Sequence, residues 1–237
     1  MLKMQNKKIL IAKNISRECP GLIKEVLGNN GLGFEEIDLN ENRFPDTKNY
    51  SAVFVLGGPD SANDSTPKIK GEIKRISEAV DAKIPFFGVC LGMQALVKAR
   101  GGEVFKNPVK EIGCKDSSGN YFQIELTQKG KSDMIFRGCD SKLKIFQLHG
   151  ETVNLTSGMD LLAVGDICKN QVVKIGDNAY GFQGHLELTG EMFERWLKED
   201  ADLRTLSISD LREHFYNLKS EYEKNGMKIL NNFVKLQ

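Results

Sequence analysis

The chain has 237 residues, of which 40% are hydrophobic, and this length suits one large domain with a sizeable core. Its 33 Lys and Arg residues against 32 Asp and Glu residues give a formal charge of +1, so no basic surface recruits nucleic acid or an anionic membrane. No apolar stretch approaches the roughly 18–20 residues that span a bilayer, and residues 1–8 are polar without the apolar core of a leader peptide, so we expect a cytoplasmic protein.

Strands and helices alternate through the first hundred residues. The apolar runs predict strands at residues 9–12, 34–39, 52–56 and 86–89. Helices are predicted at residues 21–27, after the capping pair Thr66-Pro67, and at residues 91–100. This alternation predicts a parallel sheet covered by helices on both faces, with the functional site at the carboxyl ends of the strands.

From Gly102 onward the pattern changes to short strands and turns. We expect antiparallel strands that complete and extend the sheet, at residues 104–105, 121–126, 143–146, 161–164, 171–175 and 180–182. The tail is predicted to be helical at residues 191–198 and 209–224, with Gly226 separating the second helix from the apolar residues 227–234. The second helix has one apolar face, which covers the core or, as the alternative, contacts another subunit.

Cys90 has the surroundings of a nucleophile. It lies in Gly88-Val89-Cys90-Leu91-Gly92, where an apolar strand turns directly into a helical pattern. Such a turn exposes the central side chain, and flanking glycines allow close backbone approach. The N-terminus of the following helix favours a thiolate. The pentapeptide alone is equally compatible with an inert buried cysteine.

Two further segments complete a catalytic pattern. His185 and Glu187 lie two residues apart on an extended segment, so the carboxylate can orient the imidazole and stabilise its cationic form. Gly57 and Gly58 follow an apolar strand and can offer a backbone N–H to a developing oxyanion. Taken separately, His185 is as compatible with a packed or surface histidine, and the glycine pair with an ordinary turn.

The remaining cysteines do not form a recognisable framework. Their odd number and irregular spacing argue against a disulfide scaffold or a structural zinc site. The five cysteines are Cys19, Cys90, Cys114, Cys139 and Cys168. We therefore expect no metal and no cofactor.

With these motifs the chain resembles the class I glutamine amidotransferases. Residues 88–94 match the family's nucleophile motif, residues 56–59 match its oxyanion strand, and His185 with Glu187 matches its His-x-Glu pair. The resemblance extends from about residue 9 to about residue 197. It is closest to the free-standing branch that is similar to the amidotransferase domain of GMP synthase and that includes γ-glutamyl peptidases. Gly184 replaces a usual aromatic residue and Leu186 a common proline, which affects the wall beside His185.

The resemblance implies a flavodoxin-like α/β fold: a doubly wound, mostly parallel sheet with helices on both faces, an antiparallel extension and a helical C-terminal tail. It implies a catalytic domain at residues 1–200, with residues 201–237 as a helical extension of the same domain. Gln94 is implied to hold the glutamyl group. The neighbouring substrate-binding residues would be Gly57, His149, Gly150 and Glu151, although a turn histidine with a solvated glutamate explains residues 149–151 equally well.

The implied chemistry is hydrolysis of the γ-amide of glutamine. Cys90 would attack the carboxamide, Gly58 and Leu91 would bind the oxyanion, and His185, oriented by Glu187, would transfer protons. Residues 31–33 lack the Gly-Lys-Ser/Thr of a nucleotide-binding phosphate loop, so ammonia would pass to a separate synthetase subunit. The alternatives are a self-sufficient hydrolase of γ-glutamyl compounds and a catalytically silent binding or regulatory module.

Overall fold

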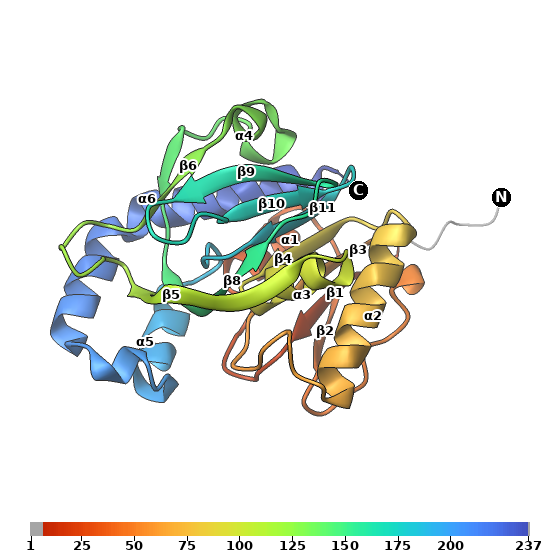
Figure 1. Ribbon diagram of the computed structural model, residues 1–237, viewed down its shortest axis with the longest axis horizontal. Helices are drawn as coiled ribbons and strands as arrows, with labels where there is room; N and C mark the ends of the chain where they lie inside the picture. The colour runs from red at the N-terminus through yellow and green to blue at the C-terminus, as the bar shows by residue number, and fades with distance from the viewer. Residues whose placement is uncertain (1–6, 237) are drawn as a thin grey trace.

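Five parallel strands form one side of a nine-stranded sheet in the computed structural model, which describes residues 7–236 (Figure 1). Residues 1–6, which hold most of the predicted polar N-terminal segment, lie outside the described residues. In spatial order the parallel strands are β2 (Phe34–Asp38), β1 (Ile9–Lys13), β3 (Ala52–Val55), β4 (Phe86–Val89) and β11 (Ala179–Phe182). The apolar runs of β1, β3, β4 and β11 are buried on both faces, as expected for parallel strands, whereas no residue of the edge strand β2 is buried.

An antiparallel extension continues from β11. Its strands, in order, are β10 (Val172–Ile175), β9 (Met159–Gly165), β6 (Gln123–Leu126) and β7 (Lys142–Lys144). The expectation that all short strands after Gly102 are antiparallel members of this sheet is wrong in two respects. Strand β11 runs parallel to β4, and β5 (Glu103–Gly113) pairs with β8 (Gln147–Asn154) in a separate two-stranded sheet.

Helices cover both faces of the central strands. On one face, α2 (Pro67–Asp81) and α3 (Leu91–Ala99) contribute apolar side chains to a cluster with β1, β3 and β4. Thr66 caps α2 by accepting a hydrogen bond from the N–H of Ile69, with Pro67 in the first helical position. On the other face, α1 (Leu22–Asn29) and the long α6 (Ile208–Val234) pack against the same strands. The predicted fold class is confirmed.

The C-terminal helices form a third apolar cluster beside the sheet. It joins α5 (Gly190–Glu199) to the first half of α6 through stacked rings of Phe193 and Phe215, with centroids 4.1 Å apart. The predicted apolar face of α6 is confirmed, since Leu211, Phe215, Leu218 and Tyr222 are buried. The short elements are α4 (Gln128–Ser132) and the 3₁₀ turns η1 (Thr47–Asn49), η2 (Met134–Phe136) and η3 (Leu203–Thr205).

Gly226 does not interrupt the tail, because α6 is continuous from Ile208 to Val234. A Cβ atom at position 226 would lie 2.3 Å from the backbone oxygen of Leu186. The glycine therefore allows the helix to approach the backbone that follows β11, rather than ending the helix.

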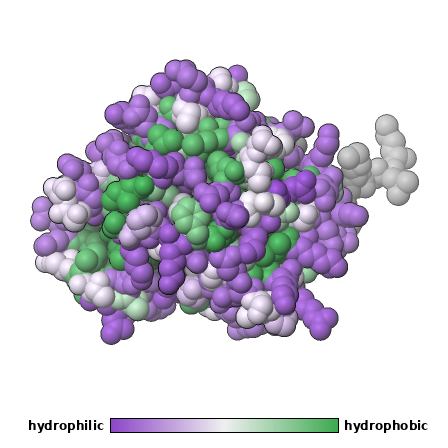
Figure 2. Space-filling model, in the orientation of Figure 1, coloured by the Kyte–Doolittle hydropathy of each residue, from purple (hydrophilic) through white to green (hydrophobic). Residues whose placement is uncertain are grey.

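The surface seen in Figure 2 is mainly hydrophilic, with apolar side chains in several separate areas. None of the helices formed by residues 7–236 combines the length and apolar character needed to cross a bilayer. The carboxyl ends of β3, β4 and β11 lie side by side, because Val55 pairs with Gly88 and Phe182 pairs with Val89. Residues that follow these strands consequently meet at one edge of the sheet.

Candidate active site

Cys90 occupies a strained turn between β4 and α3. Its backbone has φ +52° and ψ −107°, and only Lys83 shares a positive φ among the non-glycine residues from 7 to 236. Such strain persists where the surroundings enforce it and is concentrated at functional sites. The Cys90 N–H donates to the backbone oxygen of Phe182 at 2.8 Å, which ties the turn to β11.

The glycines beside this turn are required by close backbone packing. A Cβ at Gly88 would lie 2.5 Å from the carbonyl carbon of Gly92, and a Cβ at Gly92 would lie 2.2 Å from the oxygen of Val55. Larger residues would push α3 away from β3 and β4. The Gly-x-Cys-x-Gly pattern therefore has a direct steric cause.

His185 and Glu187 form a buried pair beside Cys90. The Nδ1 atom of His185 lies 2.7 Å from Oε1 of Glu187, and the other carboxylate oxygen accepts the N–H of Leu186 at 2.9 Å. Burial opposes the cationic imidazole, but the Glu187 charge and hydrogen bonds with Cys90 and Glu187 raise the pKa of His185 well above its usual value. With Nδ1 directed at Glu187, Nε2 is the ring atom available to the thiol.

The backbone of His185 is fixed by its neighbours. Its N–H donates to the oxygen of Phe146 at 2.8 Å, and its oxygen accepts the hydroxyl of Tyr222 at 2.9 Å. The rings of Trp196 and His185 meet in a T-shaped arrangement with centroids 4.8 Å apart. These contacts come from three different parts of the chain, so the ring has little freedom to turn away from Cys90.

Gly57 and Gly58 follow β3 and face the same site. A Cβ at Gly58 would lie 3.4 Å from Cδ2 of Leu91, so the two residues whose N–H groups are the predicted oxyanion donors are neighbours. A Cβ at Gly57 would lie 2.4 Å from Oε2 of Glu18. Both glycines are therefore held against residues that border the reacting centre.

A cleft of about 670 Å³ opens over Cys90. Gly58, Gln94, Gly150 and Glu151 contribute to its wall. Gln94 donates from its amide to the backbone oxygen of Glu151 and to Oε1 of Gln183, both at 3.3 Å. A larger groove, between α1, α5 and α6, is not lined by Cys90, His185 or Glu187 among the described residues.

Residues 22–201 match the family model for glutamine amidotransferase class-I. The chain belongs to this family. The matched range includes Cys90, His185 and Glu187. The resemblance seen in the sequence is thereby confirmed.

Relatives within and around the family differ in their described activities. The chain is 32% identical over 176 residues to a glutamine-hydrolyzing GMP synthase subunit of Methanosphaera stadtmanae, covering 71% of this chain and 81% of that protein. It is 27% identical over 155 residues to γ-glutamyl-L-1-hydroxyisopropylamide hydrolase of a Pseudomonas species, covering 64% of this chain and 52% of that protein. The crystal structure of a glutamine amido transferase from Methylobacillus flagellatus has the same fold, with a TM-score of 0.84 and 24% identity over 97% of this chain and 94% of that one.

The departure from the family at Gly184 has a steric explanation. A Cβ at this position would lie 2.7 Å from Oε1 of Gln147 and 2.8 Å from the side chain of Ile145. The space that an aromatic residue would require is therefore filled from the adjacent segment. Leu186, the second departure, is buried in the core that includes α1 and α6.

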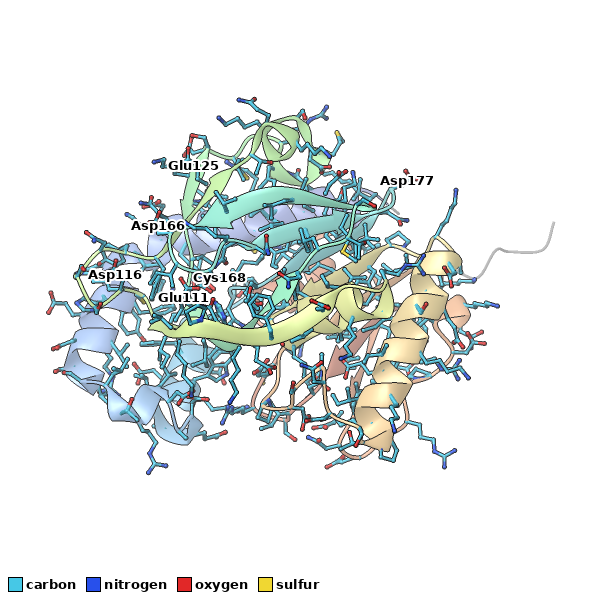
Figure 3. The ribbon with its side chains drawn as sticks, in the orientation of Figure 1. Glu111, Asp116, Glu125, Asp166, Cys168 and Asp177 are labelled. Atoms are coloured by element: carbon cyan, nitrogen blue, oxygen red, sulfur yellow. The ribbon has the colours of Figure 1, made fainter. Side chains whose placement is uncertain are left out.

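His149 borders the cleft through its backbone rather than its ring. Its side chain is 1% exposed, and Nε2 lies 2.9 Å from Oε2 of Glu111. Donor atoms of Glu111, His149 and Cys168 lie within 4.8 Å of one another and could hold a metal ion. Glu111 and Cys168 are labelled in Figure 3. However, Nε2 of His149 and Oε2 of Glu111 already face each other directly, and burial raises the pKa of Cys168 to about 11, which favours the thiol. We therefore interpret the three residues as a buried polar network beneath β8.

Two residues near Cys90, Gln183 and Glu18, were not anticipated from the sequence. The Cys90 sulfur lies 3.8 Å from the oxygen of Leu148 and 3.8 Å from Nε2 of Gln183. Glu18, in the loop after β1, lines the cleft although only 5% of its surface is exposed. Its place at the carboxyl end of a predicted parallel strand was the available signal, but a single acid in a polar loop is too common to be selected.

Proposed function

We propose that the protein hydrolyses the γ-amide of glutamine or of a γ-glutamyl compound through a thioester on Cys90. The observation that supports this most directly is the buried arrangement of Cys90, His185 and Glu187 at the edge of the sheet. The strained turn presents the sulfur, and the 2.7 Å contact between His185 and Glu187 sets the tautomer of the base.

The first half of the reaction forms the thioester. The Cys90 thiolate attacks the γ-carbonyl carbon, and the N–H groups of Gly58 and Leu91 stabilise the oxyanion. One such donor contributes about 3 kcal/mol to transition-state stabilisation. The imidazolium of His185 then gives its proton to the leaving nitrogen as the carbon–nitrogen bond breaks.

The second half releases glutamate. Neutral His185 takes a proton from water, the hydroxide attacks the thioester carbon, and the carbon–sulfur bond breaks to restore the thiolate. Glu187 stabilises the imidazolium during both halves. We assign glutamyl binding to Gln94, Gly57, Gly150 and Glu151, together with the backbone of His149, because these groups border the cleft or hold its wall.

The leading proposal for the released ammonia is transfer to a separate synthetase subunit, which the similarity to the GMP synthase subunit of Methanosphaera stadtmanae supports. Self-sufficient hydrolysis of γ-glutamyl compounds is the second candidate. The open cleft of about 670 Å³ favours it, because clefts of this size accept drug-sized ligands and leave space beyond a glutamine side chain. A silent binding module is the third candidate, which the intact set of reacting groups disfavours.

We also propose that residues 201–237 belong to the catalytic domain. Tyr222 in this segment donates to the backbone oxygen of His185, and Phe233 packs against Phe54 and Phe87 of the central sheet. The extension thus supports both the core and the proposed base.

The deciding experiment incubates the purified chain alone with glutamine and with γ-glutamyl dipeptides, measuring ammonia and free glutamate. We expect glutamate release that is abolished by Cys90→Ala and retained by Cys139→Ser, a partly exposed cysteine outside the cleft. Release of ammonia from glutamine that rises when a synthetase partner is added would support the leading candidate. No cleavage of any substrate, with or without cell extract, would favour the silent module.

A further inference from the structure

Gln183 lies beside the proposed nucleophile, directly after β11. Its side chain is fully buried, and its Nε2 atom lies 3.8 Å from the Cys90 sulfur. N–H···S contacts are longer than N–H···O contacts because sulfur is the larger atom. Among residues 7–236 this sulfur is the one hydrogen-bond acceptor of the Gln183 NH2 group. A buried amide donor without an acceptor is costly, so the contact satisfies a group that would otherwise be unpaired.

Two neighbouring groups fix which end of this amide faces the sulfur. The backbone oxygen of Glu151 can only accept a hydrogen bond, and it lies 3.3 Å from Nε2 of Gln94. The same nitrogen of Gln94 lies 3.3 Å from Oε1 of Gln183. A reversed Gln183 amide would bring two donors together, so this chain of contacts keeps the oxygen toward Gln94. The end of Gln183 that faces Cys90 is therefore the donor.

The Cys90 sulfur has use for such a donor when it is ionised. The sulfur also lies 3.8 Å from the backbone oxygen of Leu148, which accepts from a thiol but repels a thiolate. His185 forms a hydrogen bond with Cys90, yet it gives its proton to the leaving nitrogen in the proposed reaction. A donor that does not titrate holds the charged sulfur independently of that transfer.

The backbone places Gln183 as firmly as it places His185. The N–H of Gln183 donates to the oxygen of Gln171, the residue before β10, at 2.8 Å. The oxygen of the preceding Phe182 accepts the N–H of Cys90, also at 2.8 Å. Gln183 and His185 are two residues apart, so their side chains can point to the same side of this segment. Both consequently reach the sulfur from the end of β11.

We propose that Gln183 is a catalytic residue whose amide N–H donates to the Cys90 thiolate and stabilises it. This inference rests on the proposed function and adds a fourth group to Cys90, His185 and Glu187. Before the attack, Gln183 and His185 together hold the thiolate. When the thioester is hydrolysed and the carbon–sulfur bond breaks, the sulfur regains its negative charge, and the same N–H stabilises it. Gln183 neither gains nor loses a proton in either half of the reaction.

The test measures the rate at which iodoacetamide alkylates Cys90 as a function of pH, with the labelled peptide identified by mass mapping. Gln183→Met removes the donor but keeps a side chain of similar length. Loss of a hydrogen bond to a charged group should raise the pH of half-maximal alkylation by about one unit. Below that midpoint the variant should react about tenfold more slowly, and the two rates should converge at high pH.

The matched control is Gln147→Met. Gln147 is also buried, and its Oε1 atom has no hydrogen-bond partner among the described residues, so its replacement should leave the pH profile unchanged. Urea unfolding verifies that each variant is folded. Gln183→Asn draws the amide back from the sulfur and should show the same rise in the midpoint, which covers the case that Gln183→Met does not fold.

An unchanged midpoint in a folded Gln183 variant would overturn the inference, even if stability or turnover decreased, because a purely structural role leaves the charge of the sulfur unaffected. Alkylation requires no substrate, so its outcome is separate from that of the proposed function. If the unmodified chain released glutamate from no γ-glutamyl substrate, the proposed function would fail, whereas a raised midpoint would still support donation from Gln183 to the thiolate.

Discussion

Tyr222 offers a direct way to test how the C-terminal helix supports the proposed base. Its hydroxyl donates to the backbone oxygen of His185 at 2.9 Å and accepts the N–H of Leu188 at 3.2 Å. Tyr222→Phe would leave both buried backbone groups without this partner. Each unpaired buried group costs about 1–3 kcal/mol, so the free energy of unfolding should decrease by several kcal/mol.

This loss should be measured by urea unfolding monitored by circular dichroism. With an m-value of a few kcal/mol/M, the midpoint should decrease by on the order of 1 M. The matched control is Tyr216→Phe, on the same helix, whose exposed hydroxyl bonds only to Glu194 among the described residues. Turnover of a γ-glutamyl substrate should also decrease in Tyr222→Phe, because His185 loses a support. Equal midpoints for the two variants would refute the reasoning.

Three further predictions concern individual side chains. Cys90 should be the cysteine alkylated by 6-diazo-5-oxonorleucine in peptide mass mapping, and labelling that persists in Cys90→Ser would contradict its assignment as nucleophile. His185→Ala should abolish turnover while Glu187→Gln keeps a small residual rate, because only the first variant removes both proton transfers; normal turnover in His185→Ala would exclude the mechanism. Burial raises the pKa of Glu72 from 4.5 to about 7, with an opposing hydrogen bond from Asn14. The folded state then holds the Glu72 proton more tightly than the unfolded state does. The contribution of this proton to the free energy of unfolding is therefore complete below pH of about 4.5 and is lost as the pH rises to about 7. Glu72→Gln should flatten this decline and be more stable at pH 8 by up to about 3 kcal/mol in urea unfolding, and an unchanged pH profile would refute the shift.

The parallel half of the fold was predictable because its signals are local. Each strand is a short apolar run, and helices such as α2 carry both a cap and an apolar stripe. The second half was less predictable because its pairing depends on distant segments. Strand β11 inserts between β4 and β10, and β8, which was not predicted as a strand, pairs with β5 in a separate sheet; neither follows from residue spacing.

The candidate site, like the fold, was predictable only in part. The motif residues Cys90, His185 and Glu187 were recognisable because each follows a strand that ends at the same edge. The orientation of His149 was not, since a histidine beside a glycine can direct its ring to either face of a strand. Glu18 was not predicted because its burial arises from tertiary packing against Gly57, and such a contact produces no local sequence pattern.

Two glycines hold the backbone that carries the proposed base. A Cβ at Gly21 would lie 2.1 Å from the oxygen of Glu187, and one at Gly226 would lie 2.3 Å from the oxygen of Leu186. Gly226 belongs to α6. A nascent chain of which only the first two hundred residues have left the ribosome therefore contains all the reacting side chains but lacks the helix that packs against their backbone. The proposed hydrolysis would then depend on the docking of α6 against this backbone.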